Sequence, residues 1–343
     1  MVYGSNSPEL DPGSGADKVN LSTSALVGVV IVNFYSAGHL HRCLAALEVQ
    51  SRPADRVLVI NNGDEDGALN FIALRYPSIQ VIDQPNIGFA GANNLAIEVL
   101  RDYQWVALLN PDAFPEPNWL AMLLSAAERR ADVAVFSSQL LQAENTAKLD
   151  GEGDIYHVSG LAWRWNHGRL ATDSSWCGEV FSACAAAALY KVDALLDVQG
   201  FDTSYFCYFE DVDLGFRLRL RGHRCVHVPN AIVHHVGGGS SGGKKYSDFA
   251  LYHGHRNLVW TYVKNMPGYL FWLLLPLHIL LNVVEIIWFT SLGHGRVIWR
   301  AKRDAIKALP AVWAKRKLIQ AERKVTPSSM LRHMSFWPLT LDK

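Results

Sequence analysis

Three carboxylates and three arginines lie within one short stretch of the chain, at residues 209–222. Glu210, Asp211 and Asp213 follow a run of aromatic residues and precede the arginines. A carboxylate within hydrogen-bond reach of an attacking hydroxyl can take its proton as a general base. Acids in the first turn of a helix also interact favourably with the helix dipole. The pattern therefore allows two interpretations, catalysis by Glu210 and Asp211 or stabilisation of a following helix, and Asp213 fits the second better.

A second candidate group consists of Asp112, in the sequence Asn110-Pro-Asp112, and the neighbouring histidines His234 and His235. A carboxylate, a histidine and several waters can hold Mg²⁺ or Mn²⁺, and the histidine would favour Mn²⁺. Successive residues of a strand point to opposite faces, so at most one of the two histidines faces a given site. The alternatives are that Asn-Pro-Asp is only a turn and that the histidine is structural.

Strand and helix patterns alternate in the first third of the chain, which predicts βαβ units and a parallel sheet. Ligands of such sheets bind at the carboxyl ends of the strands. Polar residues follow four of the expected strand ends, at Asn33, Asn61–Asp66, Asn86–Asn94 and Asn110–Asp112. Buried strands are predicted at residues 25–34, 56–62, 78–84 and 105–113, and helices at 38–50 and 67–76.

The second half of the chain has a less regular pattern. Residues 141–175 are polar and rich in Trp and Gly, which predicts loops and short antiparallel strands. A strand is expected within 176–192, a helix over 212–222 and a further strand over 223–236. The glycine-rich run at 237–245 is long enough to form a mobile lid.

Composition excludes several classes of protein. The formal net charge is zero, which argues against a general nucleic-acid binder. The five cysteines are scattered and never spaced CxxC, so a zinc ribbon or disulfide framework is not expected and a reducing cytosol fits best. Residues 1–24 have neither a basic nor an apolar region, which predicts a flexible leader and no signal peptide.

A hydrophobic run at residues 269–291 is about long enough to cross a bilayer. Pro276, His278, Asn282 and Glu285 interrupt it, and a glutamate at mid-depth would be costly in lipid. Spanning, interfacial or re-entrant, and buried soluble helices all remain open. From Arg296 onward basic residues outnumber acidic ones about four to one, which suits an anionic cytoplasmic leaflet.

Six ordered motifs between Val27 and Asn265 resemble those of glycosyltransferase family 2, and within it the bacterial rhamnosyltransferase-like branch. Each motif alone is weak, but their joint order and spacing are specific. The resemblance implies a GT-A fold, a Rossmann-like, mostly parallel α/β sheet flanked by helices, with hydrophobic membrane-associating helices at the C-terminus. The motifs are VVIVNF, VINNGDEDG, NIGFAGANN, LLNPDA, GFDTSYFCYFEDVDLGFRLRLRG and VPNAIVHHVGGGS.

The resemblance also implies a division of the chain and of its functional residues. The catalytic domain would span residues 25–265, with a nucleotide-sugar half at 25–115 and an acceptor half at 116–265, and the membrane-associating segment would follow at 266–343. Asn61 stands where most relatives have aspartate, yet an amide can still bind a pyrimidine edge. The positions that match donor-binding positions are Asn33, Asn61, Asn62, Asp64, Asn86, Gly88, Asn93, Asn110 and Asp112.

For catalysis, the resemblance implies an inverting, metal-dependent sugar transfer with Asp211, in the Glu210-Asp211 pair, as the general base. Asp112, with His235 or His234, would hold Mn²⁺ or Mg²⁺, and Arg256 is a candidate phosphate contact on the acceptor side. The donor would be a dTDP- or UDP-sugar, such as dTDP-rhamnose. The acceptor would be a glycan or a polyprenyl-diphosphate-linked saccharide at the cytoplasmic face of the bacterial inner membrane, or in the cytoplasm.

Two other functions compete with this interpretation. A sugar nucleotidyltransferase shares the α/β plan but needs a glycine-rich basic phosphate loop after the first strand, where this chain has Asn-Phe-Tyr-Ser. A non-catalytic carbohydrate-binding scaffold would have lost the chemistry, and the presence of Asp112, Asp211 and His235 argues against it.

Overall fold

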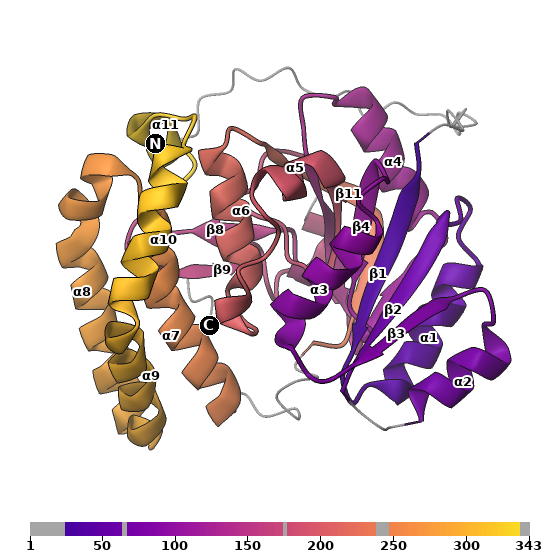
Figure 1. Cartoon of the computed structure of the whole chain (residues 1–343), viewed down its shortest axis with the longest axis horizontal. Coiled ribbons are helices and arrows are strands. Elements are labelled where there is room, and N and C mark those ends of the chain that lie inside the picture. The colour runs from indigo at the N-terminus through magenta and orange to yellow at the C-terminus, as the bar shows by residue number, and fades with distance from the viewer. Residues whose placement is uncertain (1–24, 64–66, 174–176, 238–246, 337–343) are drawn as a thin grey trace.

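The computed structural model describes residues 25–63, 67–173, 177–237 and 247–336. A nine-stranded mixed sheet runs through these residues in the order β3-β2-β1-β4-β10-β6-β11-β5, with β7 paired to β6 (Figure 1). Strands β1 to β4 are parallel, β10 runs antiparallel between β4 and β6, and β11 is parallel to β6. The predicted leader at residues 1–24 and the glycine-rich run after Gly237 lie outside the described residues.

The first half of the sheet forms because β-branched runs are buried on both faces, as a parallel sheet requires. Its strands end on one edge, where the polar residues predicted from the sequence follow. The elements of this half are β1 (Val27–Asn33), α1 (Ala37–Glu48), β2 (Arg56–Asn62), α2 (Ala68–Arg75), β3 (Gln80–Gln84), α3 (Gly88–Val99) and β4 (Trp105–Leu109).

The second half adds short strands and the helix that carries the acids. Strands β8 and β9 form a separate antiparallel pair beside the main sheet. The elements are β5 (Ala113–Pro115), α4 (Trp119–Arg129), β6 (Val135–Gln142), β7 (Asn145–Gly151), β8 (Asp154–Tyr156), β9 (Ala162–Arg164), η1 (Ala171–Asp173), β10 (Ala187–Lys191), α5 (Val192–Asp197), η2 (Thr203–Tyr205), α6 (Glu210–Leu220) and β11 (Cys225–His235).

A layer of C-terminal helices covers α6 on the side away from the sheet (Figure 1). The layer packs through a hydrophobic cluster that includes Phe216 of α6, Tyr262 of α7 and Phe271 of α8. The helices are α7 (Asp248–Asn265), α8 (Gly268–Ser291), α9 (Gly295–Lys307), α10 (Leu309–Ala321) and α11 (Pro327–Leu331).

The α/β sheet predicted from the sequence is confirmed, and several element bounds differ from the expectation. The acid-bearing helix begins at Glu210, two residues before the predicted start, because Phe209 takes a left-handed conformation and starts the helix there. Only residues 187–191 of the stretch 176–192 form a strand. The run 269–291 forms one continuous helix with Pro276 inside it, so the re-entrant hairpin is wrong.

Candidate active site

Side-chain amides line the edge where β1 and β2 end. Asn33 and Asn61 are paired in register, and the amide of Asn33 donates to Oδ1 of Asn61 at 3.0 Å. The amide of Asn61 donates in turn to Asp83 at the end of β3, at 2.8 Å. These hydrogen bonds hold the two amides and the carboxylate in one arrangement. The arrangement offers donors and acceptors of the kind that a base or ribose needs.

The loop before α3 is held by two further asparagines. Asn62 donates to Oδ1 of Asn86 at 3.2 Å and accepts from the N–H of Ile87 at 3.1 Å. Oδ1 of Asn86 also accepts from the N–H of Gly88 at 2.9 Å. Gly88 has φ of +77°, and a Cβ there would lie 2.6 Å from the ring of Phe206, so this position favours glycine.

The remaining predicted donor residues differ in position. Asn93 is buried in α3, and its amide donates to the carbonyl of Phe89 at 2.9 Å. Asn110 lies in the turn after β4, where its N–H donates to the carbonyl of Ala186 at 2.9 Å. Asp64 falls outside the described residues. The structure therefore gathers Asn33, Asn61, Asn62 and Asn86 at one edge.

A carboxylate and a histidine from distant parts of the chain meet beside this edge. Asp112 follows β4, and its Oδ1 lies 3.4 Å from Nε2 of His235 at the end of β11. The other ring nitrogen of His235 contacts Oδ2 of Asp150 at 2.7 Å, and Asp150 forms an ion pair with Arg164. This order of carboxylate, imidazole and carboxylate resembles a metal ligand held by an outer carboxylate.

The protonation states of this group bear on cation binding in two ways. Burial would lower the pKa of His235, but Asp112 and Asp150 outweigh it and raise that pKa, so a cation would displace the ring proton, while both carboxylates are held in the charged form. Burial would raise the pKa of Asp112, but the contacts with His235 outweigh it and lower that pKa. The contacts of Asp150 with His167, His235 and Arg164 likewise outweigh its burial and hold its pKa well below the usual range. Nε2 of His235 is buried and makes no hydrogen bond of good geometry. Asp112 and His235 therefore fit a divalent cation, although no cluster of three ligating side chains occurs among the described residues.

His234, the neighbour of His235, faces the other side of the strand. Its Nε2 lies 3.1 Å from Oε1 of Glu116, away from Asp112. The strand period of two residues separates the two histidines, as the sequence predicted. Only His235 reaches Asp112.

The two acids at the start of α6 have different surroundings. Oδ1 of Asp211 accepts from the N–H of Val212 at 2.8 Å, and Oδ2 accepts from the N–H of Ala185 at 3.3 Å. Burial raises the pKa of Asp211, while these two N–H groups and the charge of Arg164 oppose the rise. Glu210 is buried with no partner for Oε2, and its burial and the charge of Asp211 raise its pKa well above the usual range. Asp211 is therefore the better proton acceptor of the pair.

Sequence reasoning missed Asp150, which lies beside His235, and Asp154 and Arg164, which lie near Asp211. Asp154 and Arg164 are direct partners across the β8–β9 pair, and Ser182 donates to Asp154 at 2.8 Å. All three residues lie in the stretch 141–175, which showed only polar composition without a recognisable motif. Arg164 places a positive charge between the carboxylate that holds His235 and the acids near Asp211.

The buried carboxyl of Asp154 predicts a pH-dependent stability. Burial and the charge of Asp211 raise its pKa to about 8, far above the value of about 3.9 in an unfolded chain. The folded state therefore binds the extra proton, and the free energy of unfolding should fall as pH rises between about 4 and 8. Thermal denaturation across this range should show a smaller decline for Asp154→Asn than for the wild type. Equal declines would contradict the assignment.

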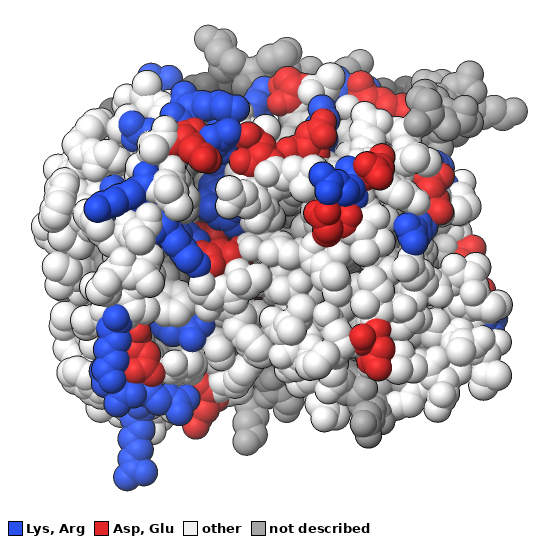
Figure 2. Space-filling model, in the orientation of Figure 1, with Lys and Arg blue, Asp and Glu red and all other residues white. Residues whose placement is uncertain are grey.

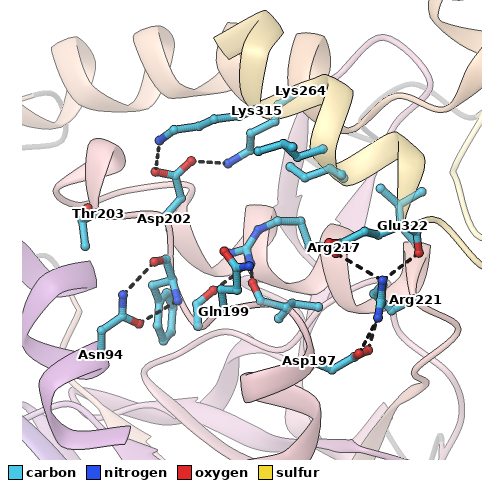
Figure 3. Close-up of a pocket in the computed structure, with 16 residues that line it drawn as sticks. Asn94, Asp197, Gln199, Asp202, Thr203, Arg217, Arg221, Lys264, Lys315 and Glu322 are labelled. Atoms are coloured by element: carbon cyan, nitrogen blue, oxygen red, sulfur yellow. Dashed lines mark hydrogen bonds and ion pairs between the residues drawn. The ribbon is translucent and has the colours of Figure 1, made fainter. Parts of the chain in front are cut away.

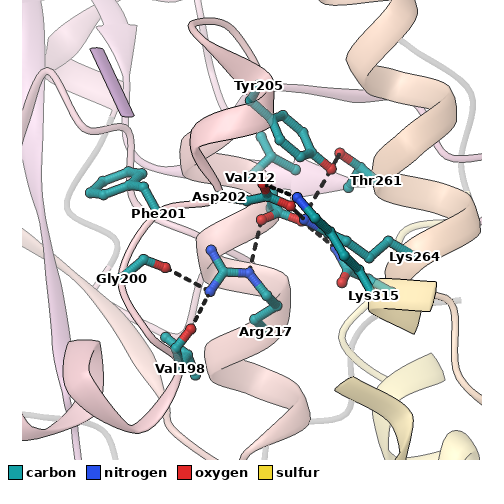
Figure 4. A network of polar contacts seen from close by, with 12 residues as sticks. Val198, Gly200, Phe201, Asp202, Tyr205, Val212, Arg217, Thr261, Lys264 and Lys315 are labelled. Carbon is teal, nitrogen blue, oxygen red and sulfur yellow. Dashed lines mark hydrogen bonds and ion pairs between the residues drawn. The ribbon is translucent and has the colours of Figure 1, made fainter. Parts of the chain in front are cut away.

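Asp213 and the arginines of α6 form buried structural contacts. Asp213 contacts Nε of Arg217 at 2.8 Å, Nζ of Lys264 at 2.7 Å and the hydroxyl of Tyr205 at 3.1 Å. Figure 4 shows these three partners, Arg217, Lys264 and Tyr205, in one polar network. Arg219 contacts Glu179 at 3.0 Å and is also buried. Both arginines therefore meet an acid inside the protein.

A cavity of about 560 Å³ lies beside the C-terminal end of α6, the end opposite Glu210 and Asp211 (Figure 3). Its walls are held by ion pairs, with Asp202 between Lys264 and Lys315, and Arg221 between Asp197 and Glu322. These charges satisfy one another, and the cavity is lined by the second half of α6, away from Asp211. The cavity is therefore separate from the acids and amides described above.

Arg256, a predicted phosphate contact, is turned toward the protein. Its Nη2 donates to the carbonyl of Tyr205 at 3.0 Å, and its guanidinium lies 4.2 Å from the ring centre of Trp260. It holds the segment before the acids and does not point into open space.

Comparisons with known proteins give consistent similarities. The sequence model of the family described as "Glycosyltransferase like family 2" matches residues 24–257. The N-acetylglucosaminyl-diphospho-decaprenol L-rhamnosyltransferase of Mycobacterium tuberculosis (strain CDC 1551 / Oshkosh) is 29% identical over 250 residues, which cover 66% of this chain and 80% of the relative. The rhamnosyltransferase WbbL of Escherichia coli (strain K12) is 23% identical over 217 residues, or 60% of this chain and 81% of the relative.

A solved structure shares the fold. The crystal structure of GalNAc-T7 with UDP, GalNAc and Mn²⁺ aligns with a TM-score of 0.51 at 13% identity, covering 61% of this chain and 43% of that one. At that identity the likeness concerns the fold alone.

Proposed function

The chain belongs to glycosyltransferase-like family 2, and from this premise we propose that it transfers a sugar from a nucleoside-diphosphate donor to a hydroxyl of a lipid-linked glycan. It is a glycosyltransferase of the GT-A fold, with rhamnosyltransferases among its relatives. The observation that best supports the proposal is the approach of Asp112 and His235 from distant parts of the chain, beside the amide-lined edge of the sheet.

The donor is proposed to be a dTDP- or UDP-sugar, with dTDP-rhamnose first. The names of two relatives specify rhamnosyl transfer, and one of them names an N-acetylglucosaminyl-diphospho-decaprenol acceptor. By analogy, a polyprenyl-diphosphate-linked saccharide is the proposed acceptor. Residues 25–115 would bind the donor and 116–265 the acceptor, with Asn33, Asn61, Asn62 and Asn86 beside the nucleotide. Asp64, Gly88, Asn93 and Asn110 remain proposed donor-binding positions.

Asp112 and His235 would hold the divalent cation, Mn²⁺ or Mg²⁺. A bound cation would offset the negative charge that develops on the departing diphosphate. Asp150 keeps the ring of His235 in place through Nδ1, so Nε2 stays directed toward Asp112. His234 has no part in this arrangement, since it contacts Glu116.

Asp211 is proposed to take the proton of the acceptor hydroxyl as that hydroxyl attacks the anomeric carbon. The N–H groups of Val212 and Ala185 fix the carboxylate, and Arg164 favours its charged form. Attack on the face opposite the diphosphate inverts the anomeric centre. Glu210, whose burial raises its pKa and favours its neutral form, would support the base without replacing it.

A donor screen tests this function. Purified protein with Mn²⁺ and a panel of nucleotide sugars is expected to release nucleoside diphosphate slowly from one donor, and a chelator should stop the release. Addition of a polyprenyl-diphosphate N-acetylglucosamine should accelerate release from that donor. If no donor in the panel releases nucleoside diphosphate and calorimetry detects no nucleotide binding, the proposal is contradicted and the carbohydrate-binding scaffold is favoured.

The C-terminal helices are proposed to bind the cytoplasmic surface of the membrane, where the lipid-linked acceptor lies. Among the described residues, α8 is the one helix long and apolar enough to cross a bilayer. Its polar residues face the protein: Nδ1 of His278 contacts the carbonyl of Ser159 at 2.7 Å, and Glu285 lies 2.6 Å from Nζ of Lys302. Such packing along the helix favours an interfacial position over a span.

The outer face of α8 is apolar and exposed along its whole length. Large side chains occupy it, with Trp272 and Ile287 each 65% exposed. Figure 2 shows few charges along this edge of the molecule and a group of basic side chains at the end of α9 beside it. Basic residues next to an apolar face are typical of helices that bind anionic lipid.

Charged substitutions on this face should release the protein from membranes. Leu280→Glu combined with Ile287→Glu is expected to weaken binding to phosphatidylglycerol vesicles about 100-fold, because two exposed apolar side chains lose their burial in lipid. Co-sedimentation with vesicles measures the change. Leu74→Glu is the matched control, since Leu74 is 86% exposed on α2. A double variant that still sediments, or that only loses self-association, would contradict the membrane assignment.

A further inference from the structure

The backbone directly before the catalytic acids has a conformation that side chains rarely adopt. Phe206, Tyr208 and Phe209 have φ values of 66°, 63° and 68°, although none is glycine. Positive φ is unfavourable for residues with bulky side chains, so the surrounding structure must hold the segment in place. The position of Glu210 and Asp211 depends on it, because α6 begins at its end.

One buried amide on α7 contacts three carbonyls of this segment. Nδ2 of Asn257 lies 3.1 Å from the carbonyl oxygen of Tyr205, 2.9 Å from that of Cys207 and 2.7 Å from that of Tyr208. Asn257 is completely buried, and its Oδ1 accepts from Nε of Arg256 at 2.9 Å. An amide nitrogen has only two hydrogens, so at least one of them is shared between two of the three carbonyls.

Arg256 supports the same segment from the next position. Its Nη2 donates to the carbonyls of Ser204, at 3.3 Å, and Tyr205, at 3.0 Å. The guanidinium is fixed by stacking over Trp260. Asn257 and Arg256 thus direct their donors at four carbonyls, those of Ser204, Tyr205, Cys207 and Tyr208.

The segment also contacts the donor side of the site. The carbonyl of Phe206 accepts from the N–H of Ala90 in α3 at 3.3 Å, and the ring of Phe206 fills the space beside Gly88. Residues 205–209 therefore lie between the donor loop before α3 and the acids of α6.

We propose that Asn257 is a positioning residue, which fixes the distance and orientation of Asp211 relative to the donor by holding residues 205–209. The inference rests on the proposed transfer reaction. Asn257 acts through the backbone and touches no substrate.

Asn257→Asp is the sharpest test, because the carboxylate keeps the shape of the amide but has no N–H. Its oxygen would face three carbonyl oxygens, and the segment should move. The kcat for transfer should fall about 100-fold, the usual cost of a misplacement near 1 Å. The donor KM should change much less than kcat. Hydrogen–deuterium exchange should become faster for the amides of residues 204–213 in the intact protein.

Gln50→Glu is the matched control. Nε2 of Gln50 is buried and donates to the carbonyls of Ala46 and Glu116, at 3.1 and 2.8 Å, far from the acids in the sequence. Gln50→Glu replaces a buried amide by a carboxylate, as Asn257→Asp does. The control variant should therefore lose stability but keep its kcat. Asn257→Ser, which keeps one short donor, replaces the aspartate variant if that variant does not fold and should show a smaller fall.

The outcomes separate the inference from the proposed function. A wild-type kcat for Asn257→Asp, or unchanged exchange over residues 204–213, overturns the positioning role. A wild type that turns over no donor contradicts the proposed reaction instead, and the exchange measurement then still decides whether Asn257 holds the segment.

Discussion

Replacement of Asp211 by Asn is expected to lower kcat about 1,000-fold, within the range that a general base contributes. The amide has nearly the same shape and can still accept one of the two backbone hydrogen bonds that fix the side chain. It cannot take the proton of the acceptor hydroxyl. Donor and Mn²⁺ affinities should stay unchanged, since Asp211 contacts neither the amide-lined edge nor Asp112 in the described structure. Steady-state kinetics and calorimetry with the nucleoside diphosphate measure both parts.

Two further variants distinguish catalysis from stabilisation of the helix. Asp193 is an exposed first-turn acid of α5, and Asp193→Asn removes only a favourable charge at a helix start. Glu210→Gln should cost far less than Asp211→Asn, because burial and the charge of Asp211 raise the pKa of Glu210 and favour its neutral form, which glutamine resembles. If Asp211→Asn behaves like Asp193→Asn, Asp211 is not the base. If Glu210→Gln loses as much activity as Asp211→Asn, the roles of the two acids must be exchanged.

Loss of the proposed cation ligands is the second large expected effect. Asp112→Asn and His235→Gln should each lower Mn²⁺ affinity and reduce kcat at saturating donor by about 100-fold or more, since the charge on the departing diphosphate loses its counter-charge. Isothermal titration with Mn²⁺ and the nucleoside diphosphate measures the affinity separately from turnover. Excess Mn²⁺ should restore part of the activity.

His234→Gln provides the internal control for the cation site. The two histidines are adjacent in sequence, but His234 contacts Glu116 on the opposite face of β11. We expect near wild-type metal affinity for this variant. Equal losses of Mn²⁺ affinity in His234→Gln and His235→Gln would show that the substitutions disturb strand β11 and not a cation ligand. Activity of the wild type that persists with a chelator would remove the cation from the mechanism.

The location of the apolar helix was open from the sequence because composition does not reveal which face of a helix is covered. His278, Asn282 and Glu285 interrupt the hydrophobic run, and their presence argued against a span. In the folded chain these residues face α7, α9 and the loop at Ser159, where Glu285 pairs with Lys302. The exposed face that remains is apolar. The mean hydropathy of residues 269–291 could not show this, because it does not distinguish one face of the helix from the other.

The sequence by itself determined the parallel half of the sheet, strands β1 to β4. Buried parallel strands require continuous β-branched runs, and the polar residues after them must gather at one edge because parallel strands end together. The order of the motifs likewise predicted the family, and the first-turn acids predicted a helix nearby. These features are local, or follow from the chain order of neighbouring strands.

Only the tertiary structure decided which polar groups meet across long separations. Asp150, Asp154 and Arg164 lie in a stretch without a motif, yet sheet pairing brings them beside His235 and Asp211. The same holds for Asn257, whose amide is aimed at a backbone segment about fifty residues earlier. The physical reason is that hydrogen bonds, burial and pKa depend on distances between side chains, and packing sets these distances while local pattern does not.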